Sequence, residues 1–405
     1  MALALASFSA RWQHLNDWLS AHRELWQPAP FTGSSPEWTR RWPQLDRQVA
    51  GLSDEQCELF ENEPVALAHR LMSMLPALAE LPGMTRLPEL ADDALAQSCT
   101  LAEVRARDMP GRKRRQSGAF VAAVRPFDAP VLDWCCGKGH LARTLLPLSQ
   151  YPVSGYDWNP ALVDDGNRLA RRAGDPVHLF CRDVMADDLN LPADAHAVAL
   201  HACGDLHRRL ISQAAKRRLS RLSVAPCCFH LCSQSDYRPL SRQARQWPGC
   251  LPVTRADLRL AVEETVTAPA RVRNQVRLFS QWRLGFDGLQ RQLRQLDQYL
   301  PVPSHPGWMA KADFRQFCRW AADKTRITLP EPVDYRAWEA YGAQRLAQVR
   351  RHELVRHLFR RPLELWLVMD YAVFLEEQGY EVRLGTFCDR NLTPRNLLID
   401  ATRKH

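Results

Sequence analysis

The chain lacks any apolar run long enough to cross a membrane. A membrane-spanning helix needs about 18 or more consecutive apolar residues, whereas the richest stretch, Leu363–Leu375, is interrupted by Glu364 and Asp370. The first ten residues are apolar but carry no basic group, which argues against a secretory signal. We therefore expect no membrane partner and a cytoplasmic location.

Lysine is scarce, and arginine supplies most of the positive charge. Only six of the 54 basic residues are lysines, and the formal net charge is +9. Arginine suits forked contacts to phosphate or carboxylate, although heavy arginine use can also reflect genome composition. The basic residues concentrate in segments 105–115, 216–221 and 350–361. Each segment is typical of a solvated helix face, and together they hint at an acidic partner such as nucleic acid.

No two of the twelve cysteines are separated by two residues, a spacing that is common in structural zinc sites. Two adjacent pairs occur instead, Cys135-Cys136 and Cys227-Cys228. Neighbouring cysteines rarely form structural disulfides, so we expect reduced thiols.

The chain has 405 residues, of which 46% are hydrophobic and 24% charged, as in ordinary globular proteins. No internal repeat is present. Residues 1–104 predict a helical accessory region, with a loop at 28–36, a helix start at Ser53 and a helix over 65–75 that ends at Pro76. The remaining predicted parts are a core at 105–235, a largely helical insertion at 236–355 and a closing unit at 356–405.

From Pro130 onwards, short apolar runs alternate with helical stretches. The predicted strands are Val131–Trp134, Val153–Tyr156, His178–Cys181, Ala197–His201 and Arg221–Ala225. The predicted helices are Gly139–Leu148, Ala161–Ala173 and Leu206–Leu219. This alternation predicts an α/β fold with a parallel sheet covered on both faces.

The last fifth of the chain predicts how the sheet closes. Residues 362–378 have helical periodicity, and Gly379 follows as a helix stop. Tyr380–Phe387 and Asn396–Thr402 then predict two strands of a hairpin. Arg271–Phe286 is the rival candidate for the closing strands, and we prefer the terminal segment.

A glycine-containing loop joins the first predicted strand to its helix. Gly137 and Gly139 allow a tight turn and a close backbone approach to a ligand at the helix N-terminus. The third glycine of a dinucleotide-binding loop is replaced by Ala142, which weakens that interpretation without excluding it.

Two acidic residues follow the next two strands. Asp157 lies 20 residues after Gly137, where a carboxylate can accept hydrogen bonds from both ribose hydroxyls of an adenosine. Asp183 follows the third strand, where it can accept from the adenine amino group. A glycine loop and two acids at three successive strand ends predict an adenosine-binding site at a topological switch point.

The fourth and fifth strands end in residues able to carry chemistry. His201, Cys203 and Asp205 follow one strand, and Cys227, Cys228 and His230 follow the other. Four interpretations remain open. In the first, zinc is bound by Cys227, Cys228, His230 and Cys232, with His201 or Cys203. In the second, Cys227 is a nucleophile, and in the third, His201 or His230 is a general base. In the fourth, the cysteines pack beneath a ligand. Packing is the single interpretation we favour, and we expect no metal.

Five runs together resemble a known family over nearly the whole chain. They are Met109–Arg114 (MPGRKR), Asp133–Leu141 (DWCCGKGHL), Leu200–Leu206 (LHACGDL), Cys227–His230 (CCFH) and Thr393–Leu397 (TPRNL). They resemble the methyltransferase-domain proteins of the methyltransferase-like 25 group and, more distantly, the tRNA acceptor-stem 2'-O-methyltransferases. The tRNA-modifying relatives carry a further histidine after the CCxH run and N-terminal zinc fingers. Here Leu231 occupies that position and no such fingers are present.

The resemblance implies a Rossmann-like seven-stranded class I methyltransferase sheet with an N-terminal helical domain and a helical insertion. It also implies S-adenosyl-L-methionine as cofactor. The residues expected to contact the cofactor are Asp133, Cys135, Gly137, Lys138, Gly139, His140, Leu141, Asp157, Asp183 and His201. The residues expected to serve catalysis are His201, Cys203, Asp205, Cys227, Cys228 and His230.

We therefore expect a methyltransferase that acts on RNA, tRNA included, through segments 105–115, 216–221 and 350–361. The alternatives are a protein or small-molecule acceptor, a cofactor-binding module without activity, and a nicotinamide dehydrogenase. Nothing in the sequence indicates an oligomeric state.

Overall fold

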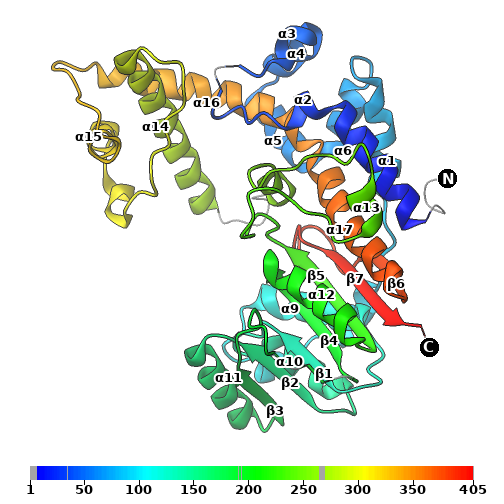
Figure 1. The fold of residues 1–405 in the computed structure, drawn as a ribbon. Helices are drawn as coiled ribbons and strands as arrows, with labels where there is room; N and C mark the ends of the chain where they lie inside the picture. The colour runs from blue at the N-terminus through cyan, green and yellow to red at the C-terminus, as the bar shows by residue number, and fades with distance from the viewer. Residues whose placement is uncertain (1–6, 34, 190, 193, 264–269, 405) are drawn as a thin grey trace. The chain divides into compact units, whose positions relative to one another are not determined.

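A computed structural model describes residues 7–33, 35–189, 191–192, 194–263 and 270–404 of the chain (Figure 1). The chain forms two compact units. Unit 1 contains Met1–Leu19, Gly83–Thr267 and Arg361–His405, and unit 2 contains Ser20–Pro82 and Ala268–Arg360.

Unit 1 is built on a seven-stranded sheet with the order β3-β2-β1-β4-β5-β7-β6. Its parallel strands are β1 (Val131–Trp134), β2 (Val153–Asp157), β3 (Val177–Cys181), β4 (His196–Cys203) and β5 (Arg221–Cys227). The antiparallel strands are β6 (Tyr380–Thr386) and β7 (Leu397–Arg403). The predicted α/β fold with a seven-stranded sheet is confirmed.

The central strands are apolar because helices cover the sheet. All four residues of β1 are buried, as expected for a strand in the middle of a covered parallel sheet. Three of the parallel strands are followed by a helix, namely β1 by α10 (His140–Leu145), β2 by α11 (Pro160–Ala173) and β4 by α12 (Asp205–Arg217). Before β1 comes α9 (Gly111–Ala123), whose residues 116–123 are all buried.

The terminal segment closes the sheet, as predicted. Helix α17 (Arg360–Glu377) leads through Gly379 into the hairpin of β6 and β7, and β7 pairs with β5. The buried Tyr380 hydroxyl donates to the backbone oxygens of Ala214 (3.0 Å) and Leu219 (2.8 Å). These bonds tie the closing hairpin to the end of α12.

The rival prediction for the closing strands, Arg271–Phe286, is wrong. This segment lies in the helix α14 (Ala270–Arg294). Its buried residues Phe279, Trp282, Phe286 and Leu289 recur every three or four positions, and this period places them on one helical face.

The segment that follows β5, which includes residues 237–241, is held to the rest of unit 1 by hydrogen bonds to a buried carboxylate. Asp370 of α17 is fully buried and accepts from the Tyr237 hydroxyl at 2.6 Å. It also accepts from the Leu240 amide at 2.7 Å and from the amide and hydroxyl of Ser241 at 3.0 and 2.6 Å. The segment therefore packs on the closing helix of the sheet, whereas the sequence assigned residues 236–355 to one insertion.

Unit 2 joins N-terminal helices with the later helices of the predicted insertion. Helix α16 (Tyr335–His357) packs on α14, on α15 (Phe314–Thr325) and on α2 (Arg23–Trp26), α4 (Pro43–Ala50) and α5 (Asp54–Asn62). Arg350 donates to both carboxylate oxygens of Glu61, and Arg356 donates to the Trp26 oxygen at 2.9 Å. Residues 289 and 330 positions apart thus form one unit, a pairing that local sequence pattern cannot indicate.

The remaining α-helices of the described residues have at most eight residues, except α1, which has 14. They are α1 (Phe8–Ala21), α3 (Trp38–Arg41), α6 (Pro64–Leu71), α7 (Leu81–Thr85), α8 (Asp93–Ser98) and α13 (Arg242–Gln246). The predicted helix start at Ser53 is confirmed by a capping box in which Ser53 accepts from the Gln56 amide. Within the described ranges, no helix is long and apolar enough to span a bilayer.

We expect acid to destabilise unit 1 through His207, whose imidazole is fully buried. Its Nδ1 donates to the Ala202 oxygen (2.9 Å), and its Nε2 accepts from the Tyr371 hydroxyl (3.2 Å). Burial lowers the pKa of His207 to about 4. Between about pH 6.5 and this value the unfolded chain binds a proton that the folded chain does not, so the free energy of unfolding falls as the pH falls, by about 3 kcal/mol in all.

Urea unfolding at about pH 7.5 and about pH 4.5 measures this loss. His207→Gln removes the titrating group, so the variant should lose about 3 kcal/mol less than the wild type between the two pH values. Equal losses in both proteins would contradict this role of His207.

Candidate active site

A cavity of about 600 Å³ opens at the carboxyl ends of β1, β4 and β5. The chain leaves β1 toward β2 on one side, and β4 lies on the other side of β1, so this edge is the topological switch point of the sheet. The lining residues come from α9, the three strand ends, the start of α10 and the connection between β6 and β7. They are Pro110, Arg112, Lys113, Gln116, Ser117, Asp133, Cys135, Cys136, Leu141, Leu200, His201, Cys203, Cys227, Cys228, Thr393 and Arg395.

The glycine loop after β1 has three residues in the left-handed region. The φ angles are +59° at Cys135, +56° at Gly137 and +68° at Gly139, the residue that precedes α10. A side chain at Gly139 would come within 2.8 Å of the Leu179 side chain. Glycine is therefore required at Gly139 both by backbone angle and by space.

Asp157 holds this loop in place. Its side chain is buried, and its two carboxylate oxygens accept from the amides of Gly137 and Asn159, both at 2.9 Å. The sequence predicts a carboxylate that accepts from ribose hydroxyls. In the structure the same carboxylate shapes the loop, and it keeps lone pairs for further hydrogen bonds.

Asp133 lies on the floor of the cavity. It is 2% exposed, and it accepts from the Ala142 amide at 3.2 Å. Burial raises the pKa of Asp133 to about 7. The Ser117 hydroxyl, which also belongs to a residue that lines the cavity, is buried and has no hydrogen-bond partner among the described residues. This orphaned hydroxyl and the buried carboxyl fit a ligand that carries both donors and acceptors, such as the amino acid part of S-adenosylmethionine.

His201 lies between the cavity and α9. Its Nε2 is 3.4 Å from the Gln116 Oε1, and the Gln116 Nε2 donates to the Leu392 oxygen. Because an amide oxygen can only accept, the hydrogen of His201 is on Nε2, and Nδ1 keeps its lone pair. Burial and the charge of Arg395 lower the pKa of His201 to about 4. The imidazole is therefore neutral at physiological pH, with Nδ1 unprotonated.

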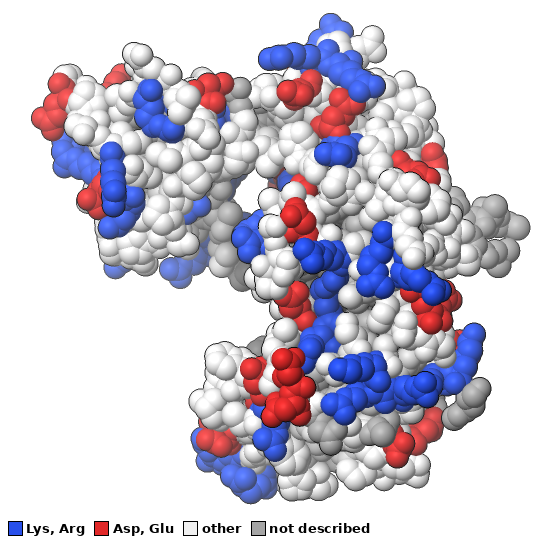
Figure 2. Space-filling model, in the orientation of Figure 1, with Lys and Arg blue, Asp and Glu red and all other residues white. Residues whose placement is uncertain are grey.

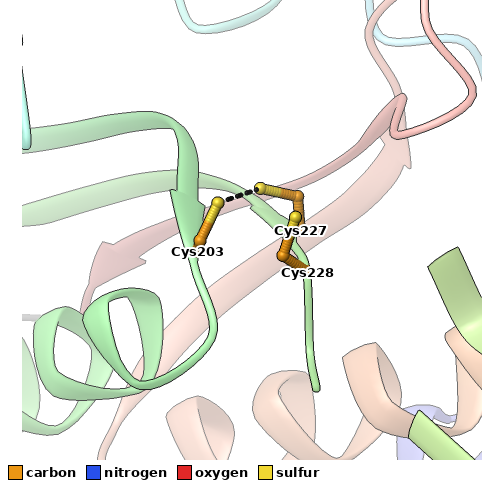
Figure 3. A group of neighbouring side chains, drawn as sticks. All are labelled: Cys203, Cys227 and Cys228. Carbon is orange, nitrogen blue, oxygen red and sulfur yellow. Dashed lines mark hydrogen bonds between the residues drawn. The ribbon is translucent and has the colours of Figure 1, made fainter. Parts of the chain in front are cut away.

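Three predicted cysteines, Cys203, Cys227 and Cys228, line the cavity and lie close together at the ends of β4 and β5 (Figure 3). The sulfur atoms of Cys203 and Cys227 are 3.3 Å apart, and that of Cys228 lies within 4.8 Å of both. Hydrogen bonds from Cys203 and Cys227 lower the pKa of the Cys228 thiol, and the same cluster raises the pKa of Cys227. Any negative charge of the cluster therefore resides first on Cys228.

Several residues predicted for the site do not line the cavity. Lys138 forms an ion pair with Asp165 on α11 (3.1 Å). The Asp205 carboxylate accepts from the Ser233 amide (2.7 Å), and Asp183 is exposed and accepts from the Met185 amide (2.9 Å). The others outside the cavity are Gly137, Gly139, His140, Asp157 and His230. The glycines and the buried polar groups among these residues support the loops around the cavity. The other predicted site residues line the cavity itself: Asp133, Cys135, Leu141, His201, Cys203, Cys227 and Cys228.

The lining residues that sequence reasoning missed include Cys136 and Leu200 and four residues from more distant parts of the chain. Gln116 and Ser117 lie on α9, which the sequence did not predict as a helix, and Thr393 and Arg395 lie in the connection of the closing hairpin. Thr393 and Arg395 lie in the TPRNL run, one of the five runs that carry the family resemblance. This run could have indicated that both residues belong to the site.

Comparison with known proteins identifies the domain. Residues 118–235 match the sequence model of a family described as a methyltransferase domain. Among similar solved structures, the tRNA (uracil-54, C5)-methyltransferase of Pyrococcus abyssi, crystallised with S-adenosyl-L-homocysteine, is 16% identical. The alignment covers 28% of this chain and 29% of that chain, with a TM-score of 0.24.

A TehB-like SAM-dependent methyltransferase from Corynebacterium glutamicum is 19% identical over 30% of this chain and 64% of that chain, with a TM-score of 0.23. The identification rests on the family match, which covers β1 to β5, the glycine loop and most of the cavity wall. Residues 118–235 are a methyltransferase domain, and its cofactor is S-adenosyl-L-methionine.

Proposed function

We propose that this protein transfers the methyl group of S-adenosylmethionine to RNA. The observation that carries the proposal is a group of three cations at the cavity, Arg112, Lys113 and Arg395, against one buried carboxyl group, Asp133. Arg112 and Lys113 are exposed at the start of α9. Positive side chains beside a reaction site favour an acceptor that carries phosphates on both sides of the reacting group.

The three predicted basic segments differ in their contacts within the protein. In segment 350–361, Arg350, Arg351 and Arg356 are engaged within unit 2, with Glu61, the Leu52 oxygen and the Trp26 oxygen. In segment 105–115, Arg105 pairs with Asp175 and Arg114 donates to the Leu101 oxygen (2.9 Å). Arg112 and Lys113 are the members of that segment that line the cavity.

Segment 216–221 lies at the other end of α12 from the cavity. Lys216, Arg217 and Arg218 are exposed there, about 20 Å from the start of the helix. Arg221 forms an ion pair with Asp400 (2.9 Å) and is part of the sheet. Figure 2 shows lysine and arginine side chains grouped over α12 and the neighbouring strands. These exposed groups suit phosphates remote from the reacting nucleotide.

Methyl transfer requires little more than an aligned acceptor atom and a group that takes its proton. A sulfonium methyl group is already activated, so the protein chiefly has to hold the acceptor atom in line with the carbon–sulfur bond. In this proposal Asp133 and Ser117 hold the cofactor. His201, neutral and unprotonated at Nδ1, takes the proton of the acceptor.

Transfer of tritium from methyl-labelled S-adenosylmethionine tests the proposed acceptor. The full chain is incubated with separate fractions of RNA, protein and small metabolites, and tRNA is resolved from the other RNA. We expect label in RNA. Label confined to protein or to metabolites would overturn the RNA proposal, and label in no fraction, with cofactor binding intact, would favour a binding module.

We expect Arg112→Ala/Lys113→Ala to weaken RNA binding in a salt-dependent way. Each phosphate that the variant no longer neutralises should reduce the slope of log K against log salt by about 0.7 to 0.9. The matched control is Arg171→Ala/Arg172→Ala, two exposed arginines at the end of α11 far from the cavity. Filter binding over a salt series measures both slopes. A slope that is unchanged in the first variant would contradict the assignment of Arg112 and Lys113.

We expect Asp157→Ala to weaken binding of S-adenosylmethionine roughly 30-fold, which corresponds to about 2 kcal/mol. The physical reason is that the Gly137 amide in the glycine loop and the Asn159 amide before α11 both lose their acceptor. Calorimetric titration measures the dissociation constant, and Asp164→Ala, which removes an exposed carboxylate on α11, is the matched control. Equal affinity of the two variants would show that the loop does not depend on Asp157.

A further inference from the structure

The sulfur atoms of three cysteines converge at the carboxyl ends of β4 and β5 (Figure 3). Cys203 ends β4, Cys227 ends β5, and Cys228 follows it. All three sulfur atoms lie within 4.8 Å of one another, and those of Cys203 and Cys227 are 3.3 Å apart. Two thiolate ligands of one tetrahedral zinc ion, at about 2.3 Å from the metal, are separated by about 3.8 Å. The Cys203–Cys227 separation of 3.3 Å is somewhat shorter than this value, and the other two separations are at most 4.8 Å.

Two irregularities of the backbone produce this convergence. Successive side chains of a regular strand point to opposite faces, but Cys228 has a φ angle of +47°, in the left-handed region that a residue with a side chain rarely adopts. This turn brings two consecutive cysteines to one point. In β4 the pairing register with β5 shifts between Leu200 and Cys203, and the shift places Cys203 opposite Cys227. Such strained positions gather at functional sites.

The cluster is open on the cavity side. All three cysteines line the cavity, and within the described ranges no histidine, aspartate or glutamate joins the group. Structural zinc sites have four protein ligands, whereas three protein ligands leave a position for water or substrate. Sulfur ligands select zinc over magnesium or calcium. Arg395, which also lines the cavity, offsets part of the negative charge of three thiolates.

We propose that Cys203, Cys227 and Cys228 hold a Zn²⁺ ion whose fourth coordination position opens into the cavity. This ligand set differs from the one that the sequence suggested. Cys232 donates instead to the backbone oxygen of Gln234 (3.4 Å), and His230 lies outside the group. Cys232 is therefore a matched control, since it is a nearby half-buried thiol that the proposal excludes from the site.

Metal analysis of the full chain, purified without a histidine tag and under reducing conditions, tests the site. We expect one zinc per chain after dialysis against a low concentration of Zn²⁺. Cys203→Ser and Cys228→Ser should each weaken zinc binding on the order of a hundredfold, and Cys232→Ser should bind zinc as the wild type does. Circular dichroism and urea unfolding establish that each variant is folded.

Cobalt substitution tests the geometry independently of activity. The Co²⁺ protein should show thiolate-to-cobalt charge-transfer absorption and the strong visible bands of tetrahedral Co²⁺. Added imidazole should shift these bands because it occupies the open position. Bands that imidazole leaves unchanged would overturn the open coordination position.

Three results would overturn the zinc site itself. In the first, the reduced wild-type protein binds no zinc. In the second, the folded variants Cys203→Ser and Cys228→Ser bind zinc with the affinity of the wild type. In the third, Cys203 and Cys227 form a disulfide in the purified protein, and this disulfide excludes the metal. All of these measurements are made without RNA. Their outcome is therefore separate from that of the methyl-transfer assay.

Discussion

Replacing His201 with alanine is expected to lower the rate constant of methyl transfer by about 10²- to 10⁴-fold, the usual contribution of a positioned general base. The effect on the dissociation constant of S-adenosylmethionine should be much smaller. The expectation follows from the hydrogen-bond partners of the imidazole. Gln116 fixes the hydrogen on Nε2 and leaves Nδ1 able to accept the proton of the acceptor.

The protonation state of His201 gives this prediction a second readout. Because burial and Arg395 lower the pKa of His201 to about 4, the imidazole is already neutral at the pH of most assays. The rate should therefore be nearly independent of pH from about pH 6 to about pH 8 as far as this residue is concerned. Single-turnover tritium transfer measures the rate.

Gln116→Ala is the control for positioning. It removes the contact that fixes the tautomer without removing the base, so we expect a smaller loss of rate than in His201→Ala. A rate in His201→Ala close to that of the wild type would contradict the role of His201 as proton acceptor.

Gly204→Ala is expected to destabilise unit 1 by more than about 4 kcal/mol, beyond the range of most single substitutions. Gly204 has a φ angle of +56°, and an added Cβ would lie 1.8 Å from the backbone oxygen of Leu231. That oxygen accepts from the Asp205 amide (3.0 Å), and the Gly204 amide donates to the Cys227 oxygen (3.0 Å). The methyl group would therefore separate the ends of β4 and β5.

Gly174→Ala is the matched control for Gly204→Ala. Gly174 ends α11 with a φ angle of +68°, and nothing lies within 4 Å of the position of an added Cβ. Its substitution carries the backbone cost alone, about 1 kcal/mol. Urea unfolding of the two variants separates the steric effect from the backbone effect. Equal losses would contradict the steric account of Gly204.

Most of the sheet could be predicted because its strands are short apolar runs that end in glycine or an acid. The closing hairpin could be predicted because Gly379 stops the preceding helix and two further runs follow. The composition of unit 2 could not be predicted, since contacts such as that between Arg350 and Glu61 join distant segments. The helix α9 was missed because RKRRQSG begins with four basic residues and continues with weak helix formers.

The part of the site formed by the backbone was predictable, and the part formed by distant side chains was not. The spacing of Gly137, Gly139 and Asp157 predicts a loop and its acid, and both lie where expected. The outward turn of Lys138 toward Asp165 depends on α11 and has no local signal. The convergence of Cys203 with Cys227 and Cys228 depends on a register shift and a left-handed residue, and neither is encoded in a spacing rule.

A crystal structure of the full chain with S-adenosyl-L-homocysteine tests the central claim most directly. We predict that the ligand occupies the cavity at the carboxyl ends of β1 and β4. Its amino acid part should lie at Asp133 and Ser117, its adenosine at the glycine loop, and its sulfur should face His201 and Cys203. A ligand bound elsewhere on the chain, or a cavity left without it at saturating concentration, would contradict the assignment of this cavity as the site of methyl transfer.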